Sequence, residues 1–469
     1  MRLVVVGNGM AGSRLVSEVR ARSRDVRVTV FGEEAWQPYN RVLLSNVLAG
    51  TASPGQIRMQ GPSWYADHDV TARLGVRVTR IDREARVVEA EDGTREPYDV
   101  CVLATGSEAV VPPIPGLAGE RVVAFRTLDD CEAILRAAEG ARRAIVIGGG
   151  LLGVEAARGL AGRGLPVTVL HLADHLMERQ LDAEAGHVLA GTLAGLGVGV
   201  RLGVTITAVR ADGSAELEGG EVVPGDLVVV ACGVRPVAGL ARDAGLAVDR
   251  GVLVDDRMRT SDPAIYAVGE CAQHDGTVYG LVAPAWEQAG VAAAVLTGGE
   301  ARYTGSRLVT RLKAAEVELA AMGETHLTDE DAEIVRFAHP ARGTYRKLVI
   351  RDDRLVGAIL VGETGAVGTL TQLYDRGTPL PGDRATLLFP GLAGPAAAES
   401  PTLMPDSATV CHCNNVSKRA IRACWESGAR DVAAVAEGTR ATTGCGTCRG
   451  AVEGLLSWLN RQDAEAPAG

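Results

Sequence analysis

The chain begins with RLVVVGNGMAG at residues 2–12, a run of β-branched residues that leads directly into a glycine-rich turn. A helical pattern follows, and then a second apolar run at residues 26–31. In this order of elements the first glycine allows the tight turn, the second lets the backbone approach a pyrophosphate, and the third lets the helix pack on the strand. We therefore expect the turn to bind a dinucleotide, with Glu33 or Glu34 accepting a hydrogen bond from its ribose.

The same arrangement returns at Gly148–Gly153, between an apolar run at residues 144–147 and a helical pattern that ends near residue 163. A single G-x-G-x-x-G sequence is weak evidence for a nucleotide site. Two copies, each in the full strand, turn, helix and strand context, are poorly explained by chance. The sequence thus predicts two α/β domains that each bind a dinucleotide.

Three other apolar runs end in residues that suit the wall of a ligand site. They lead into Thr105-Gly106-Ser107, into Cys232-Gly233-Val234 and into Gly269-Glu270. In open α/β sheets, ligands bind beyond the carboxyl ends of the strands. We therefore expect these three segments to line a cofactor.

The overall composition is that of an ordinary globular protein. The 469 residues are 46% hydrophobic and 23% charged, which excludes disordered, collagen-like and coiled-coil chains. The net charge of -10 argues against a general affinity for nucleic acid or anionic membranes. No stretch approaches the 18 apolar residues of a membrane span, and residues 1–12 do not resemble a signal peptide, so we expect a cytoplasmic protein.

The glycine turns stop after residue 302, and short strands follow. Residues 347–350 and 355–361 predict a hairpin around the turn at residues 351–354, which indicates a third, structural domain. Residues 391–407 contain three prolines and little periodicity, and they predict a linker.

Five of the nine cysteines lie beyond residue 410. Cys411 and Cys413 form a C-x-C pair, and Cys445 and Cys448 form a C-x-x-C pair. Four such thiolates can hold an iron–sulfur cluster or a tetrahedral zinc ion, and the spacing alone leaves both open. The fifth, Cys424, has no partner spacing, and we expect it to be buried.

Two short helices are expected between the cysteine pairs. Ser417 is a suitable N-cap for a helix that ends at Gly428, and Asp431 is a suitable N-cap for the next. These helices would bring the two pairs together.

Several segments resemble the N-terminal half of NADH-dependent assimilatory nitrite reductase large subunits, and equally the electron-transfer subunits of assimilatory nitrate reductases. The C-terminal part is similar to bacterioferritin-associated ferredoxin, with Cys411, Cys413, Cys445 and Cys448 matching its ligands. The other segments that carry the resemblance are Gly7–Gly12, residues 38–45, residues 104–107, Gly148–Gly153, residues 257–263 and residues 269–271.

The resemblance implies an α/β fold with two Rossmann-like FAD/NAD domains of the glutathione-reductase type, a small α+β third domain and a small helical 2Fe-2S domain at the C-terminus. The implied domains are residues 1–110 with 250–302 for FAD, an inserted NADH domain at 111–249, the α+β domain at 303–390, the linker at 391–407 and the 2Fe-2S domain at 408–461.

The resemblance also implies the cofactor-binding residues. FAD would be held by Gly7, Gly9, Met10, Ala11, Gly12, Glu33 at its ribose, Arg41 at its phosphates, Ala104, Thr105, Gly106, Gly269 and Glu270. NADH would be held by Gly148, Gly150, Leu151, Leu152, Gly153 and His171, and Gly233 would line the cofactor site.

His171 stands where an NAD-specific domain often has an acid, and residues 171–177 contain no arginine to pair with a 2′-phosphate. NADH is therefore favoured over NADPH. Val237 stands where related flavoproteins usually carry asparagine, so that side-chain contact is not expected here.

The function that the resemblance implies is electron transfer. NADH would reduce the flavin, the flavin would pass single electrons to the 2Fe-2S cluster, and the cluster would reduce a separate nitrate or nitrite reductase catalytic subunit. The protein would supply position and electrostatics, so we name no catalytic side chain. The sequence has no C-x4-C redox pair and no C-x5-C with C-x3-C siroheme pattern, so it resembles the electron-delivering part.

Two alternatives stay open at this point. The chain could be an FAD and 2Fe-2S dehydrogenase of a small amine or opine, although the second glycine turn argues against that. It could also be a flavoprotein whose C-terminal cysteines form a zinc-binding interaction module.

Overall fold

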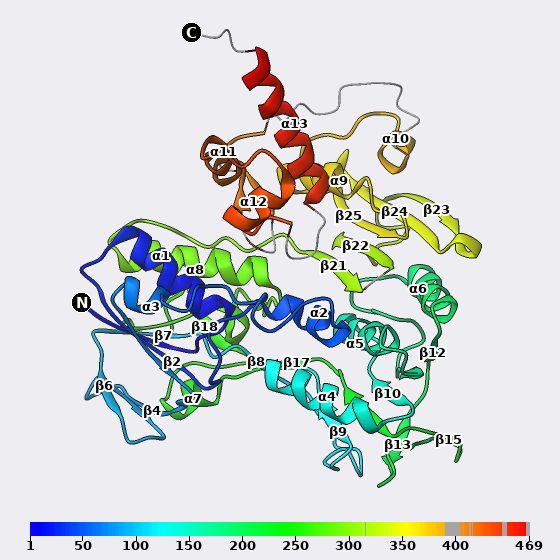
Figure 1. The fold of residues 1–469 in the computed structure, drawn as a ribbon, viewed down its shortest axis with the longest axis horizontal. Helices are drawn as coiled ribbons and strands as arrows, with labels where there is room; N and C mark the ends of the chain where they lie inside the picture. The colour runs from blue at the N-terminus through cyan, green and yellow to red at the C-terminus, as the bar shows by residue number, and fades with distance from the viewer. Residues whose placement is uncertain are drawn as a thin grey trace. The chain divides into compact units, whose positions relative to one another are not determined.

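The computed structural model describes residues 1–314, 316–389, 404–406, 408–411, 414, 416–442 and 448–465 (Figure 1). The chain divides into two compact units. The first contains Met1–Leu176 and Ala194–Leu308, and the second contains Met177–Leu193 and Val309–Gly469.

The first unit contains two five-stranded parallel sheets. One has the order β19-β7-β1-β2-β3, built from β1 (Arg2–Val6), β2 (Arg27–Gly32), β3 (Val70–Leu74), β7 (Val100–Leu103) and β19 (Ile265–Ala267). The chain runs from β1 to β2 on one side and later adds β7 on the other. The carboxyl end of β1 is therefore the point where the strand order reverses, which is where open α/β sheets bind ligands.

Two helices cover one face of this sheet. Leu15, Val16 and Val19 of α1 (Met10–Arg22) share a buried core with Ala289 and Ala292 of α8 (Val282–Leu296) and with strand residues. The two helices lie side by side in Figure 1. This packing fixes the start of α1 against the end of β1.

The second sheet has the order β12-β11-β10-β16-β9 and repeats this plan around β10. Its strands are β9 (Val122–Ala124), β10 (Ala144–Ile147), β11 (Val167–Leu170), β12 (Val198–Arg201) and β16 (Leu227–Val230). Helix α4 (Leu128–Gly140) follows β9, and α5 (Leu151–Ala161) follows β10. The predicted α/β fold with two Rossmann-like sheets is thus confirmed.

Smaller elements complete the first unit. They are η1 (Arg41–Leu43), α2 (Leu44–Ala49), α3 (Trp64–Asp67), the antiparallel sheet of β4 (Val78–Asp82), β5 (Val87–Ala90) and β6 (Arg95–Pro97), the antiparallel sheet of β13 (Ile206–Val209), β14 (Ala215–Leu217) and β15 (Val222–Val223), the pair of β8 (Ser107–Ala109) and β17 (Val234–Pro236), the pair of β18 (Val252–Val254) and β20 (Ala272–His274), α7 (Gly239–Asp243) and η2 (Gly269–Cys271).

The second unit contains an antiparallel sheet of order β21-β22-β25-β24-β23. Its elements are β21 (Val309–Ala314), β22 (Val317–Gly323), β23 (Glu333–His339), η3 (Pro340–Arg342), β24 (Thr344–Arg351), β25 (Arg354–Val361), α9 (Val367–Arg376) and α10 (Ala385–Leu388). The predicted hairpin is confirmed, with β24 longer than expected. Asp352 and Asp353 form its turn with φ of 49° and 56°, as a type I′ turn requires.

Residues 177–193, which include most of α6 (Ala183–Gly195), group with this antiparallel sheet. Asp182 caps α6 by accepting from the Ala185 amide at 3.0 Å. Its other carboxylate oxygen accepts from the Tyr345 hydroxyl at 2.8 Å and from Lys347 Nζ at 3.0 Å. The start of α6 is thereby tied to β24.

The C-terminal part contains the two predicted helices, α11 (Lys418–Glu426) and α12 (Val432–Thr439), followed by α13 (Arg449–Glu465). Two short strands, β26 (Thr409–Cys411) and β27 (Val416–Ser417), precede them. Both predicted N-caps are confirmed, because Ser417 accepts from the Ala420 amide at 3.2 Å and Asp431 from the Ala434 amide at 2.8 Å.

Two expectations about this part need comment. Cys424 is of intermediate exposure rather than buried, because it packs against the buried cluster of the C-terminal helices from outside it. Most of the predicted linker at residues 391–407 lies outside the described residues. Among the helices of the described ranges, none is long and apolar enough to cross a membrane.

Candidate functional site

The first glycine turn is closed at both ends and open in the middle. A Cβ atom on Gly7, whose φ is +113°, would lie 2.1 Å from the Ala104 carbonyl oxygen, and one on Gly12 would lie 1.9 Å from the Gly7 oxygen. Gly9 has no such neighbour, since its nearest atom is Arg41 Nε at 4.0 Å. Gly7 and Gly12 therefore allow close packing, whereas Gly9 leaves its surface open to a ligand.

Gly9 is also the N-cap of α1, and no side chain caps this helix. Met10 and Ala11 form its first turn. Helix N-termini carry unpaired N–H groups and a partial positive charge, which together suit a phosphate. A backbone cradle of this kind, without a Cβ at Gly9, fits the pyrophosphate of FAD.

The other predicted FAD segments are close to this turn. Ala104, Thr105 and Gly106 follow β7, which pairs with β1. Gly269 follows β19, and a Cβ on it would lie 2.7 Å from the Cβ of Ala11. The structure thus brings the first glycine turn, residues 104–106 and Gly269 together at the carboxyl ends of β1, β7 and β19.

Val237 contributes to this region through its backbone. Its carbonyl oxygen accepts from the Thr105 hydroxyl at 2.6 Å, and its amide donates to the Gly106 oxygen at 2.9 Å. Neither bond depends on the side chain, so a valine can form both at the position where related flavoproteins usually carry asparagine.

Glu33 and Glu34 have different surroundings. The Glu33 side chain is 68% exposed and lies 3.6 Å from Arg77, itself an exposed residue. Glu34 is 23% exposed and forms an ion pair with Arg41. The structure therefore places Glu34, and not Glu33, beside the arginine that was predicted to hold the phosphates.

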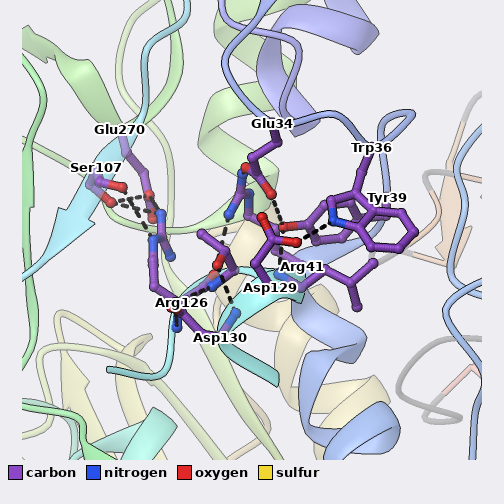
Figure 2. A network of polar contacts seen from close by, with 11 residues as sticks. Glu34, Trp36, Tyr39, Arg41, Ser107, Arg126, Asp129, Asp130 and Glu270 are labelled. Carbon is purple, nitrogen blue, oxygen red and sulfur yellow. Dashed lines mark hydrogen bonds and ion pairs between the residues drawn. The ribbon is translucent and has the colours of Figure 1, made fainter. Parts of the chain in front are cut away.

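Glu270 takes part in a contact that the sequence did not indicate (Figure 2). Arg126 forms an ion pair with the Glu270 carboxylate, and both side chains are largely buried. Ser107 lies between them, because its hydroxyl donates to Glu270 at 2.5 Å and accepts from Arg126 at 2.7 Å. Arg126 precedes α4, so this contact joins the end of β19 to the start of that helix.

A local sequence signal marks the start of α4. Thr127 accepts from the Asp130 amide at 3.1 Å, and the Asp130 carboxylate accepts from the Thr127 amide at 2.8 Å and the Arg126 amide at 2.9 Å. Together they form a capping box. That pattern could have located the helix start and the fixed backbone of Arg126, but not its ion pair.

The second glycine turn repeats the geometry of the first. A Cβ on Gly148, whose φ is +109°, would lie 2.3 Å from the Ala231 oxygen, and one on Gly153 would lie 1.9 Å from the Gly148 oxygen. Gly150 has no atom within 4 Å of such a Cβ and is the uncapped N-cap of α5, where Leu151 and Leu152 form the first turn. Gly233, with φ +95°, follows the neighbouring strand β16. This turn fits a second pyrophosphate.

His171 packs directly on that turn. Its ring is 8% exposed, and Nδ1 accepts from the Gly149 amide at 3.0 Å. A Cβ on Gly149 would lie 2.7 Å from the ring. His171 is therefore at the predicted place, at the end of β11, but its Nδ1 is bonded to the protein backbone.

Two of the four predicted cluster ligands lie in the described residues. Cys411 and Cys448 are 0% and 6% exposed and belong to one buried cluster. The Thr442 amide lies 3.2 Å from Cys448 Sγ and can donate to it, as backbone amides do to cluster sulfurs. Cys413 and Cys445 lie outside the described residues. The two buried thiols fit a group that is held by thiolates.

Comparison with known families agrees with each part of the chain. Residues 1–293 match the pyridine nucleotide-disulphide oxidoreductase family, and residues 309–378 match the rubredoxin NAD+ reductase C-terminal domain. Residues 409–458 match the BFD-like 2Fe-2S binding domain, which assigns the cysteine module to iron–sulfur rather than zinc.

Individual relatives support the same assignment. An NAD(P)H nitrite reductase of Bacillus subtilis (strain 168) is 38% identical over 100% of this chain, and the assimilatory nitrate reductase electron transfer subunit of that organism is 37% identical over 100%. This chain covers 59% and 61% of their lengths. A nitric oxide reductase FlRd-NAD(+) reductase of Aeromonas hydrophila is 33% identical over 70% of this chain and 85% of its own.

Solved structures show the same fold. Putidaredoxin reductase, in its covalent complex with putidaredoxin, has a TM-score of 0.75 and 27% identity over 85% of this chain and 96% of that chain. A ferredoxin reductase of Rhodopseudomonas palustris has a TM-score of 0.75 and 27% identity over 81% and 95%. The predicted resemblance and fold class are confirmed: the chain belongs to the pyridine nucleotide-disulphide oxidoreductase family and carries a BFD-like 2Fe-2S domain.

Proposed function

We propose that the chain takes electrons from NADH through FAD to a 2Fe-2S cluster, and from there to a separate nitrate or nitrite reductase catalytic subunit. The observation that carries this proposal is the duplicated turn. Gly9 and Gly150 are equivalent open positions, each at the reversal point of a parallel sheet, and both belong to one compact unit. Two dinucleotides in one unit are what hydride transfer from NADH to a flavin requires.

FAD, when bound, supplies the conversion of a two-electron donor into one-electron steps. This chain's part is to bind and orient it. The amides at the start of α1 and the Arg41 guanidinium would bind its pyrophosphate, and Glu270 would accept from its hydroxyl groups. The residues proposed to line this site are Gly7, Gly9, Met10, Ala11, Gly12, Arg41, Ala104, Thr105, Gly106, Gly269 and Glu270.

NADH would lie on the second turn. The residues proposed for it are Gly148, Gly150, Leu151, Leu152 and Gly153, with His171 and Gly233 beside them. The ribose role of Glu33 stays a prediction, since its carboxylate is mostly in solvent.

The cluster would be held by Cys411, Cys413, Cys445 and Cys448. Burial of Cys411 and Cys448 supports this, because a cluster held by buried thiolates is shielded from solvent. The acceptor is inferred from the relatives, which are named as a nitrite reductase and as the electron transfer subunit of a nitrate reductase. The amine or opine alternative is less well supported, because it leaves the second turn without a role.

The test is a visible spectrum and low-temperature EPR of the anaerobically purified protein, before and after NADH. We expect the flavin band to bleach and a rhombic one-electron iron signal to appear. Flavin bleaching with no iron signal would refute the electron path. A second measurement adds a purified nitrate or nitrite reductase catalytic subunit and follows NADH oxidation that depends on its substrate.

A further inference from the structure

Arg41 is held from several sides in the first unit (Figure 2). One arm of its guanidinium pairs with Glu34, and the other donates to the Arg126 carbonyl oxygen at 3.2 Å. The guanidinium carbon lies 5.1 Å from the centre of the Tyr39 ring. Its Nε faces the glycine turn, 4.0 Å from where a Gly9 Cβ would be. The cation is therefore fixed before any ligand is present.

Tyr39 and Glu34 complete this arrangement. Tyr39 is 4% exposed, and its hydroxyl donates to Glu34 Oε2 at 2.6 Å. The other oxygen of Glu34 accepts from Arg41. Burial raises the pKa of Tyr39 well above its ordinary value, so the phenol keeps the proton that it donates. Both oxygens of Glu34 are thus engaged by donors.

The Tyr39 hydroxyl has a second partner on a distant segment. It accepts from the Leu128 amide, the first residue of α4, at 3.0 Å. Trp36 Nε1 donates to Asp129 in the same turn at 2.7 Å. The segment that holds Arg41 is therefore bonded directly to the first turn of α4.

We propose that Glu34 and Tyr39 are positioning residues that hold Arg41 toward the pyrophosphate of FAD, and that Tyr39 links this site to the first turn of α4. The inference rests on the proposed function, because it takes FAD to be the ligand of the first turn. Fixing an arginine side chain costs rotamer entropy. When the protein meets that cost in advance, the ligand binds more tightly.

The charge of Glu34 acts in the opposite direction, since a carboxylate repels a pyrophosphate. That repulsion is offset because Glu34 is paired with the Arg41 cation and accepts from the Tyr39 hydroxyl, so we expect positioning to be the larger effect. Glu216 offers a matched control: it belongs to the same unit, has the same charge, lies outside the proposed FAD site, and pairs with Arg210, an exposed residue.

The experiment measures FAD affinity for flavin-stripped protein by the change in flavin fluorescence. Glu34→Ala is expected to raise the Kd for FAD about tenfold, and Glu34→Gln about threefold or less, because its amide oxygen still accepts from Arg41. Glu216→Ala should leave the Kd within about twofold. The inference is overturned if Glu34→Ala binds FAD as tightly as the unmodified protein does.

Hydrogen exchange tests the link to α4. FAD should slow exchange of the Leu128 amide in the unmodified protein, and this FAD-dependent change should be lost in Tyr39→Phe at saturating FAD. The ring of that variant still fills the core, so circular dichroism should be unchanged. A merely structural Tyr39 would instead lower protection equally with and without FAD, which would contradict the link.

Failure of the two proposals can be told apart. If the unmodified protein and Glu216→Ala bind no FAD, the proposed function fails and this inference fails with it. If both bind FAD and Glu34→Ala matches them, only the positioning role is lost.

Discussion

His171 Nδ1 accepts a hydrogen bond from the Gly149 amide at 3.0 Å, so the side chain at the end of β11 is bonded to the glycine turn itself. The next residue, Leu172, is 72% exposed. Just after this strand, an arginine would pair with the 2′-phosphate of NADPH, and an acid would accept from the 2′-hydroxyl of NADH. Leu172 can do neither, so the position is available to change the preference.

Leu172→Arg is therefore expected to raise kcat/KM for NADPH about tenfold, because a guanidinium there would form charge-assisted hydrogen bonds to the phosphate. The measurement is the ratio of kcat/KM for NADPH to that for NADH, with ferricyanide as acceptor. Leu253→Arg adds the same charge at another exposed leucine of the unit, one that is 38% exposed. An equal rise in both variants would mean that only net charge matters.

A second prediction concerns Asp182. Its carboxylate pairs with Lys347, whose side chain is 7% exposed, and also accepts from Tyr345. In Asp182→Ala the buried ammonium of Lys347 would lose its ion pair and keep its hydrogen bond to the Thr325 carbonyl oxygen, at 2.9 Å. We expect a loss of about 2–3 kcal/mol in the free energy of unfolding, measured by urea denaturation.

The double variant Asp182→Ala with Lys347→Met provides the control. Removing the cation as well should recover part of the loss, because no buried charge is then left unpaired. If the loss of unfolding free energy in the double variant equals the sum of the losses in the two single variants, the ion pair does not contribute to stability.

The local parts of this structure could be predicted from the sequence. The two glycine turns, the caps at Ser417 and Asp431, and the hairpin of β24 and β25 each depend on residues that are close along the chain. Backbone conformation and hydrogen bonding over a few positions decide them.

The contacts between distant segments could not be predicted. Arg126 and Glu270 are 144 residues apart and meet only because α4 and β19 belong to one packed unit. Glu33 and Glu34 are neighbours with the same chemistry. Both lie in the bend just after β2, where the alternation of strand side chains assigns a side to neither, so a choice between them needs the position of Arg41, which the sequence alone does not contain.

A third prediction concerns the thiol of Cys101. Its burial raises its pKa to about 12. An unfolded thiol loses its proton at about pH 8.5, whereas the folded one keeps it up to about pH 12. Unfolding between these values releases a proton, so rising pH favours the unfolded chain. This stabilising contribution is complete below about pH 8.5 and is lost as the pH rises toward 12.

Cys101→Ala should therefore flatten the fall in the free energy of unfolding above pH 9, by up to about 1.4 kcal/mol per pH unit. The check is urea denaturation at pH 8, 9 and 10 for both proteins. The cavity left by the substitution lowers stability at every pH, so the slope is the quantity to compare. Parallel slopes would contradict the prediction.

The last prediction separates the cluster from the flavin. Cys448 lies in the core of the C-terminal helices, which is built from residues beyond position 403, whereas the first glycine turn belongs to the other unit. Cys448→Ser should abolish the EPR signal and the two iron atoms per chain that a 2Fe-2S cluster brings, because a serine hydroxyl is a poor substitute for a thiolate. The flavin content should not change.

Cys424→Ser, on α11 of the same core, is the matched control and should keep both cofactors. NADH should still bleach the flavin of Cys448→Ser, while electron transfer to a one-electron protein acceptor should fall. Loss of flavin together with iron would show that the two cofactor sites depend on each other, against the modular arrangement argued from the two units.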